Sequence, residues 1–125
     1  MKRALVIEDN HDNFRLISYA LNRGGYEVIS AETGEAGVEL AYREKPSFVI
    51  VDINLPGIDG FEVTRRIRQS EVCRTVPIIA ITSHAMFGDR ERIIDCGCSS
   101  YFEKPIDPLT IMDKIHEIID GAEKP

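Results

Sequence analysis

The sequence predicts an α/β protein built on a doubly wound sheet of five parallel strands with helices on both faces. Strand-like apolar runs and segments of helical period alternate along all 125 residues, and this strict (βα)5 order is typical of right-handed βαβ crossovers. Three of the apolar runs are continuous, as expected of strands buried on both faces of a parallel sheet. The length is that of one ordinary domain, so we expect a single domain over residues 1–125.

Five segments have the composition of strands. The continuously apolar runs are expected at the centre of the sheet, and two segments of mixed polarity suit its edges. The central candidates are residues 4–7, 48–51 and 76–81, and the edge candidates are residues 26–31 and 99–103.

Capping residues delimit the first three predicted helices. Phe14, Ile17 and Leu21 share one face of the first helix, and the second is expected to end near Arg43. The third is expected to continue through Ile67. The caps are Gly24 after the first helix, Thr33 before the second, and Asp59 with Glu62 as a capping box before the third.

The last two helices have different signals. We expect a short helix from about Asp89 to Cys96, because Gly97 can end it. In the final helix Asp107 is the predicted cap and Pro108 occupies the first turn. Its apolar face consists of Leu109, Met112, Ile115 and Ile119. The helix is expected to end near residue 121, which leaves no room for an output domain.

Composition argues against several classes of partner. A formal net charge of −6 repels nucleic acid, and we interpret the short basic cluster Arg65, Arg66 and Arg68 as a solvated helix face. No apolar run approaches the roughly 20 residues that cross a bilayer, and the first residues show no signal-peptide cleavage site. The sequence therefore predicts a cytoplasmic protein that binds neither nucleic acid nor membrane directly.

The cysteines favour neither a disulfide framework nor a structural zinc site. Cys73, Cys96 and Cys98 form no C-x-x-C pair, and no histidine stands near them at zinc-finger spacing. We expect all three to be reduced thiols.

Polar residues follow four of the predicted strands. Glu8 and Asp9 come after the first strand and Asp52 after the third, while Thr82 with Ser83 and then Lys104 follow the last two. Each of these residues, taken alone, could be an ordinary polar residue of a loop or turn. In a parallel sheet, however, the carboxyl ends of the strands meet at one edge, where ligands bind. We therefore expect these four segments to form one site.

The chemistry of these residues favours a phosphoryl group and a hard cation. Three neighbouring carboxylates repel one another unless a cation neutralises them, and oxygen ligands without Cys or His favour Mg²⁺. A lysine and a hydroxyl can bind phosphoryl oxygens, and a carboxylate can act as the nucleophile. Asp52, at the end of a buried strand, is the best candidate for that nucleophile.

The order and spacing of these residues resemble the receiver domains of two-component signalling, the CheY-like family. The resemblance covers essentially the whole chain and implies a flavodoxin-like sheet with strand order 2-1-3-4-5. It also implies a signalling switch, not an enzyme with sustained turnover. The residues that carry it are Val6 to Asn10, Val51 to Gly60, Ile81 to Met86, and Lys104 with Pro105.

Carried over residue by residue, the resemblance implies a role for each member of the site. Asp52 would accept the phosphoryl group, and Mg²⁺ would bind Asp9, Asp52 and the backbone carbonyl of Asn54, with Glu8 reaching the metal through water. Thr82 and Lys104 would each contact a phosphoryl oxygen.

Other positions carry implied roles in switching. Thr82 and Tyr101 match the family's switch pair, although without the resemblance we would interpret Tyr101 as an amphipathic edge-strand ring. Asn54 and His84 stand where the family tunes the loss of phosphate, but His84 could also be a solvent-facing loop residue. The family further implies a cis peptide bond between Lys104 and Pro105.

The resemblance implies a sensor histidine kinase or a histidine phosphotransfer protein as phosphodonor, and an unidentified protein as target. We expect a monomer, or a weak dimer that forms on phosphorylation through the last two helices. Two alternatives remain: a receiver-like scaffold that works without phosphorylation, and a haloacid-dehalogenase-type phosphatase. The phosphatase reading is weaker, because Asn54 stands where those enzymes carry a second, proton-donating Asp.

Overall fold

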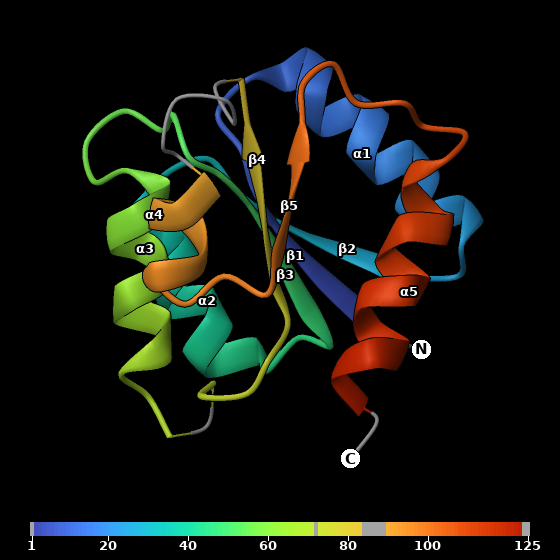
Figure 1. Cartoon of the computed structure of the whole chain (residues 1–125). Helices are drawn as coiled ribbons and strands as arrows, with labels where there is room; N and C mark the ends of the chain where they lie inside the picture. Colours follow the sequence, from blue (N-terminus) through green and yellow to red (C-terminus); the bar gives the residue numbers. More distant parts are fainter. Residues whose placement is uncertain (1, 72, 84–89, 124–125) are drawn as a thin grey trace.

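In a computed structural model, which describes residues 2–71, 73–83 and 90–123, five parallel strands form one sheet in the order β2-β1-β3-β4-β5. The predicted fold class and strand order are therefore confirmed, and the two mixed-polarity strands lie at the edges (Figure 1). The strands are β1 (Arg3–Ile7), β2 (Glu27–Ala31), β3 (Phe48–Asp52), β4 (Ile78–Thr82) and β5 (Ser100–Glu103).

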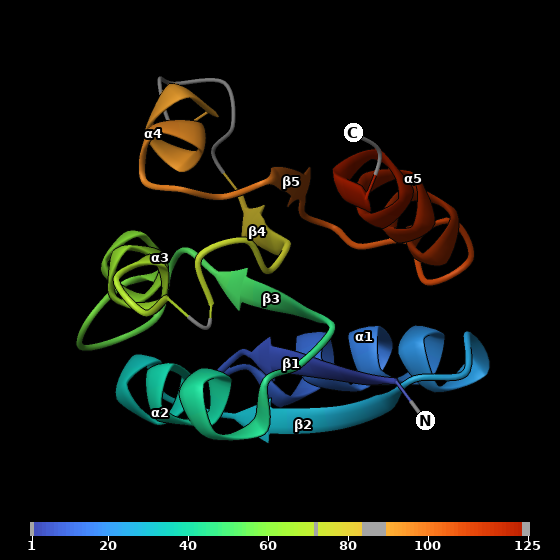
Figure 2. The same ribbon diagram turned by 90° about the horizontal axis from the view of Figure 1, so that it is seen from below.

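Helices cover both faces of the sheet. Seen with the sheet edge-on, α1 and α5 lie on one side and α2, α3 and α4 on the other (Figure 2). Among the described helices, none is both long and apolar enough to cross a membrane. The helices are α1 (His11–Arg23), α2 (Gly34–Glu44), α3 (Gly60–Arg68), α4 (Arg90–Asp95) and α5 (Ile111–Glu123).

Short polar side chains start the first three helices. The predicted caps Thr33 and Asp59 accept hydrogen bonds from the N–H groups of Ala36 and Glu62, which satisfies donors that have no partner inside the helix. Asn10 does the same for α1, a role that the sequence argument missed. These caps place the start of α1 directly after the acidic residues that follow β1.

The core has two parts, one on each face of the sheet. Successive residues of β1 alternate between them, so that Leu5 and Ile7 pack under α2 and α3, while Ala4 and Val6 face α1 and α5. Burying one such Ile or Leu side chain fully contributes about 1.5–3 kcal/mol. The two-sided packing holds the strand ends, and thus the polar residues that follow them, in fixed positions.

The last helix begins later than predicted. Residues 108–110 form a turn before α5, and the Asp107 carboxylate accepts a hydrogen bond from the N–H of Leu109 within that turn. Leu109 consequently does not lie on the apolar face of the helix and is 85% exposed. The predicted cis bond between Lys104 and Pro105 is confirmed. The proposed start of α4 at Asp89 lies outside the described residues, and α4 is described from Arg90.

The basic cluster on α3 does not form a single solvated face. Arg65 and Arg66 pair with Glu62 on the helix surface, at 3.5 and 2.9 Å. Arg68 instead turns inward, and its guanidinium donates hydrogen bonds to backbone carbonyls. The acceptors are Cys73 (3.0 Å), Arg74 (3.2 Å), Val76 (2.6 Å) and Gly97 (2.9 Å). The expectation of a solvated cluster was therefore wrong for Arg68, which ties two loops to α3.

Candidate phosphoryl and metal site

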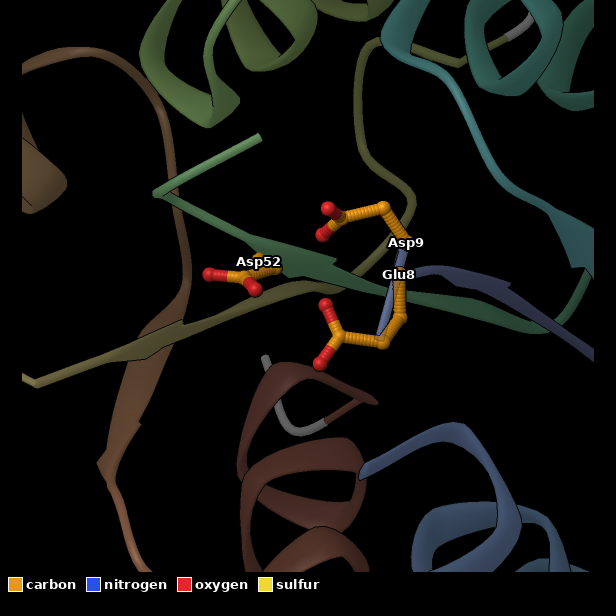
Figure 3. Close-up of side chains that lie close together, drawn as sticks. All are labelled: Glu8, Asp9 and Asp52. Carbon is orange, nitrogen blue, oxygen red and sulfur yellow. The ribbon is translucent and has the colours of Figure 1, made fainter. Parts of the chain in front are cut away.

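The acidic residues meet because β1 and β3 are neighbours in the sheet. Ile7 pairs with Val51 in the parallel register, so Glu8 and Asp9 leave β1 beside Asp52, the last residue of β3. Figure 3 shows the three side chains extending from these two strand ends into a common space. One carboxylate oxygen from each of Glu8, Asp9 and Asp52 lies within 4.8 Å of the other two.

Burial differs within this acidic cluster. Glu8 and Asp52 are each only 2% exposed, whereas Asp9 is open to solvent. The cluster thus consists of a buried pair of carboxyl groups and a third carboxylate on the solvent side. A cation can approach from the solvent side, where it would meet Asp9 first.

Both oxygens of Asp52 have hydrogen-bond donors. The backbone N–H of Asn54 donates to Oδ1 at 2.9 Å, and Nζ of Lys104 donates to Oδ2 at 3.0 Å. The backbone N–H of Lys104 donates to the carbonyl of Thr82 at 2.9 Å, which fixes the lysine at the end of β5. Lys104 therefore supplies positive charge on the side of Asp52 that faces β4 and β5.

The carboxyl group of Glu8 differs from that of Asp52 in its hydrogen bonding. Neither of its oxygens receives a hydrogen bond from a donor in the described part of the chain, so the group can bond Asp52 only when it carries a proton. Burial and the neighbouring Asp52 raise the pKa of Glu8 to about 8, because an ionised carboxylate is disfavoured in a dry site beside a like charge. When Glu8 is protonated it can donate its proton to Asp52.

Asp52 itself is held in the ionised form. Burial alone would raise its pKa, but hydrogen bonds from Glu8, the Asn54 N–H and Lys104 outweigh burial and lower the pKa below its ordinary value. The pair therefore differs in charge state, with Asp52 ionised and Glu8 prone to hold a proton unless a cation replaces it.

The structure brings together most of the residues that the sequence argument selected. Glu8, Asp9, Asp52 and Lys104 converge, and the buried Thr82 ends β4 beside them. Tyr101 lies near the start of β5, away from the strand end that precedes Lys104. Its side chain is half-buried against the core, and the guanidinium carbon of Arg90 lies 5.9 Å from the centre of its ring. His84 lies outside the described residues, so its predicted role stays a prediction.

One residue that the sequence argument did not single out shapes the site. A Cβ atom at Gly60 would lie 2.6 Å from the Cα of Ile53 and 2.7 Å from the carbonyl oxygen of Asp52. The N–H of Gly60 also donates to the carbonyl of Ile53 at 3.0 Å. Only glycine permits α3 to begin this close to the acidic strand end. The available signal was a glycine, a poor helix former, placed directly after a cap.

The fold and site together define a CheY-like α/β protein. The family model of the response regulator receiver domain matches residues 4–116. The polar-differentiation response regulator DivK of Brucella ovis is 36% identical over 121 residues, which are 97% of this chain and 98% of that protein. The chain therefore belongs to the response regulator receiver domain family, whose members are switches of two-component signalling and not classical enzymes.

Solved structures agree with this assignment. The receiver domain of the sensor histidine kinase PA1611 from Pseudomonas aeruginosa PAO1, which has a magnesium ion coordinated in its active site cleft, is 34% identical with a TM-score of 0.88. The alignment covers 95% of this chain and 98% of that one. The chemotaxis response regulator CheY4 of Vibrio cholerae has a TM-score of 0.89 at 24% identity, over 94% and 98% of the two chains, and shows the shared fold.

Proposed function

We propose that this receiver domain takes a phosphoryl group on Asp52 from a phosphohistidine of a sensor histidine kinase or phosphotransfer protein, in a reaction that needs Mg²⁺. The observation that carries the proposal is the convergence of the Glu8 and Asp9 carboxylates on Asp52, whose Oδ2 lies 3.0 Å from Nζ of Lys104. A nucleophile, a place for a cation and a fixed positive charge thus lie at the same edge of the sheet.

The donor set fits a magnesium ion. Asp9, Asp52 and the backbone carbonyl of Asn54 would hold it, with Glu8 contributing through a bound water. The two unpartnered oxygens of the buried Glu8 support this assignment, because buried polar atoms without partners are rare outside ligand sites. When bound, the ion would neutralise the carboxylates and draw the phosphoryl oxygens toward them.

The chain's own groups account for the transfer step. Asp52 is ionised, so a carboxylate oxygen can attack phosphorus while the P–N bond to the donor histidine breaks and its electron pair leaves with the imidazole. Lys104 would move from Asp52 to an oxygen of the incoming phosphoryl group, and the Thr82 hydroxyl would donate to another. The product is an acyl phosphate on Asp52.

The phosphorylated state would then change a distant surface. Movement of Thr82 toward the phosphoryl group would leave room for Tyr101 to turn inward, which shifts a pre-existing equilibrium toward another arrangement of β5 and its flanking helices. A separate target protein would recognise that arrangement, with the domain acting in the cytoplasm as a monomer or weak dimer. Asn54 and His84 would set how quickly the phosphoryl group is lost.

Intact-protein mass spectrometry tests this proposal. The native chain, Asp52→Asn and the matched surface control Asp12→Asn are incubated with acetyl phosphate, with and without Mg²⁺. We expect one labile phosphoryl adduct that requires Mg²⁺, forms on the native chain and on Asp12→Asn, and is absent from Asp52→Asn. Asn is nearly isosteric with Asp, so circular dichroism of this variant should be unchanged.

Two results would overturn the assignment. An adduct that persists in Asp52→Asn would place the acceptor elsewhere in the chain. If the native chain gains no adduct and does not bind beryllofluoride, a phosphoryl mimic, the protein is instead a scaffold that works without phosphorylation.

A further inference from the structure

A second group of polarizable side chains lies outside the acidic cluster. Cys96 follows α4 and Cys98 precedes β5, in the connection between these two elements that Figure 1 shows. Both thiols are free and buried, and their sulfur atoms are 3.8 Å apart. The two cysteines are separated by one residue, so the pair is formed within a single tight connection.

The connection between them is fixed by its surroundings. Gly97 has a φ of +115°, a left-handed conformation that favours glycine, and a Cβ atom there would lie 2.9 Å from Cγ of Arg68. Nε of Arg68 donates to the carbonyl of Gly97 at 2.9 Å. The Gly97 conformation and the Arg68 contact together hold the two sulfur atoms on the same side of the chain.

The two thiols differ in acidity. The hydrogen bond with Cys98 lowers the pKa of Cys96 to about 7, while the same contact and burial raise the pKa of Cys98. Cys98 also lies 3.5 Å from the hydroxyl of the buried Thr64. Sγ of Cys96 also donates to the carbonyl of Ile93 at 3.1 Å, so its proton must leave that bond before the sulfur reacts as a thiolate. The close approach of the two sulfur atoms is the arrangement that a dithiol exchange site requires.

The third cysteine provides an internal comparison. Cys73 points its sulfur to the carbonyl of Ala41 at 3.4 Å, and burial raises the pKa of its thiol. Burial of an isolated thiol makes it unreactive. Cys73 is therefore a matched control for the reactivity of the other two.

We propose that Cys96 and Cys98 form a thiol–disulfide exchange site that reacts with low-molecular-weight disulfides of the glutathione class and closes to an intramolecular disulfide. The Cys96 thiolate attacks one sulfur of oxidised glutathione, forming a mixed disulfide and releasing one glutathione thiolate. The Cys98 sulfur attacks the Cys96 sulfur while the Cys96–glutathione S–S bond breaks, and the Cys98 proton passes to the departing sulfur, which releases the second glutathione as a thiol. Two protein thiols are oxidised and one glutathione disulfide is reduced to two thiols.

Closure would act on the connection between α4 and β5 and not on the acidic cluster. The sulfur atoms must approach from 3.8 Å to about 2 Å, the length of a disulfide bond. That movement tightens the turn between α4 and β5. Cys96 and Cys98 are not members of the acidic cluster, so the exchange reaction can be measured on the unphosphorylated chain.

The test titrates the folded native chain with mixtures of reduced and oxidised glutathione. After acid quenching and denaturation, remaining thiols are alkylated with N-ethylmaleimide and located by peptide mass spectrometry. We expect three labels on the reduced chain, but only the Cys73 label on the oxidised chain, with loss of two hydrogens. Retention of all three labels in fully oxidised glutathione, or loss of the Cys73 label first, would overturn the proposal.

Variants and rates separate the site from general thiol reactivity. Cys73→Ala should close the disulfide like the native chain, and Cys98→Ala should stop at a glutathione adduct on Cys96. In the folded native chain, Cys96 should react with oxidised glutathione at least about tenfold faster than Cys73, a difference that should largely vanish in guanidinium chloride. Equal rates in the folded chain would contradict a preorganised site, even if Cys98→Ala failed to fold.

Discussion

At the carboxyl edge of the sheet, buried carboxylates face one another, whereas at the amino edge the guanidinium of Arg68 faces backbone carbonyls. The oxygens of Glu8 receive no hydrogen bond from a donor in the described chain, and the ionised Asp52 is compensated by the Asn54 N–H and by Lys104. Arg68 makes four backbone hydrogen bonds. The same fold thus buries the carboxylates at a cost in stability, whereas the hydrogen-bonded guanidinium of Arg68 stabilises it.

The difference separates residues kept for chemistry from residues kept for structure. A buried group that is fully hydrogen-bonded strengthens the fold, while one left without partners is tolerated where a ligand will complete it. Changes at the amino edge should therefore alter the free energy of unfolding, and changes at the carboxyl edge should alter ligand binding.

The largest effect is expected for Arg68→Ala. It removes the donor shared by the carbonyls of Cys73, Val76 and Gly97, and we expect a loss of about 3 kcal/mol in the free energy of unfolding. Urea denaturation followed by circular dichroism measures it. Arg65→Ala, which removes an exposed ion pair with Glu62, should cost no more than about 0.5 kcal/mol. Similar losses in both variants would show that Arg68 is not a structural clamp.

Asp9→Asn should act on the other edge without affecting the fold. Removing the exposed carboxylate should weaken Mg²⁺ binding about thirtyfold, which corresponds to about 2 kcal/mol, and should leave the urea midpoint unchanged. Isothermal titration calorimetry with MgCl₂ measures the affinity. Lys104→Ala is the control, because Lys104 contacts Asp52 from the side of β5 and its removal should leave Mg²⁺ binding largely intact. An unaltered titration in Asp9→Asn would move the metal site elsewhere.

An effect that is smaller per pH unit than either substitution is expected when metal is absent. The pKa of Glu8 is raised to about 8 in the folded chain, so the folded state binds this proton more tightly than the unfolded state. Its contribution to stability is present below the ordinary pKa and is lost as pH rises through about 8, at no more than about 1.4 kcal/mol per pH unit. The pKa of Asp52 is lowered, so its contribution to stability changes only at more acidic pH, where it is lost as pH falls.

Urea titrations in EDTA between about pH 5 and 8 measure that dependence. Stability of the native chain should decrease with pH, and Glu8→Gln, which cannot ionise, should flatten the curve. A slope that persists in Glu8→Gln would assign the titration to another group.

The sequence predicted the fold because its signals are local and agree with one another. Continuous apolar runs marked the central strands, and caps such as Thr33 and Asp59 marked helix starts. Asp107 was predicted to cap α5, and its carboxylate and carbonyl do accept hydrogen bonds from the N–H groups of Leu109 and Ile111. The regular helix nevertheless begins only at Ile111, after the turn at residues 108–110, and a local pattern does not show where such a turn passes into a helix.

The acidic site was predictable because the ends of parallel strands must meet at one edge. The raised pKa of Glu8 was not predictable, because the burial of Glu8 and the lack of donors to its oxygens depend on the packing of β1 against β3. The inward turn of Arg68 was missed for the same reason. Its acceptors at residues 73–76 and 97 belong to two other loops, and no helical pattern on α3 shows where those carbonyls point.

β1 and β3 are neighbours in the sheet, although β2 and α2 lie between them in the sequence. A chain emerging from the ribosome therefore carries Glu8 and Asp9 long before Asp52 can join them, and Lys104 is translated later still. In that interval the carboxylates can meet without the ammonium group that offsets them in the finished protein. Pairing of β1 with β3 before Lys104 is available would therefore require protons or dissolved cations to offset the carboxylates.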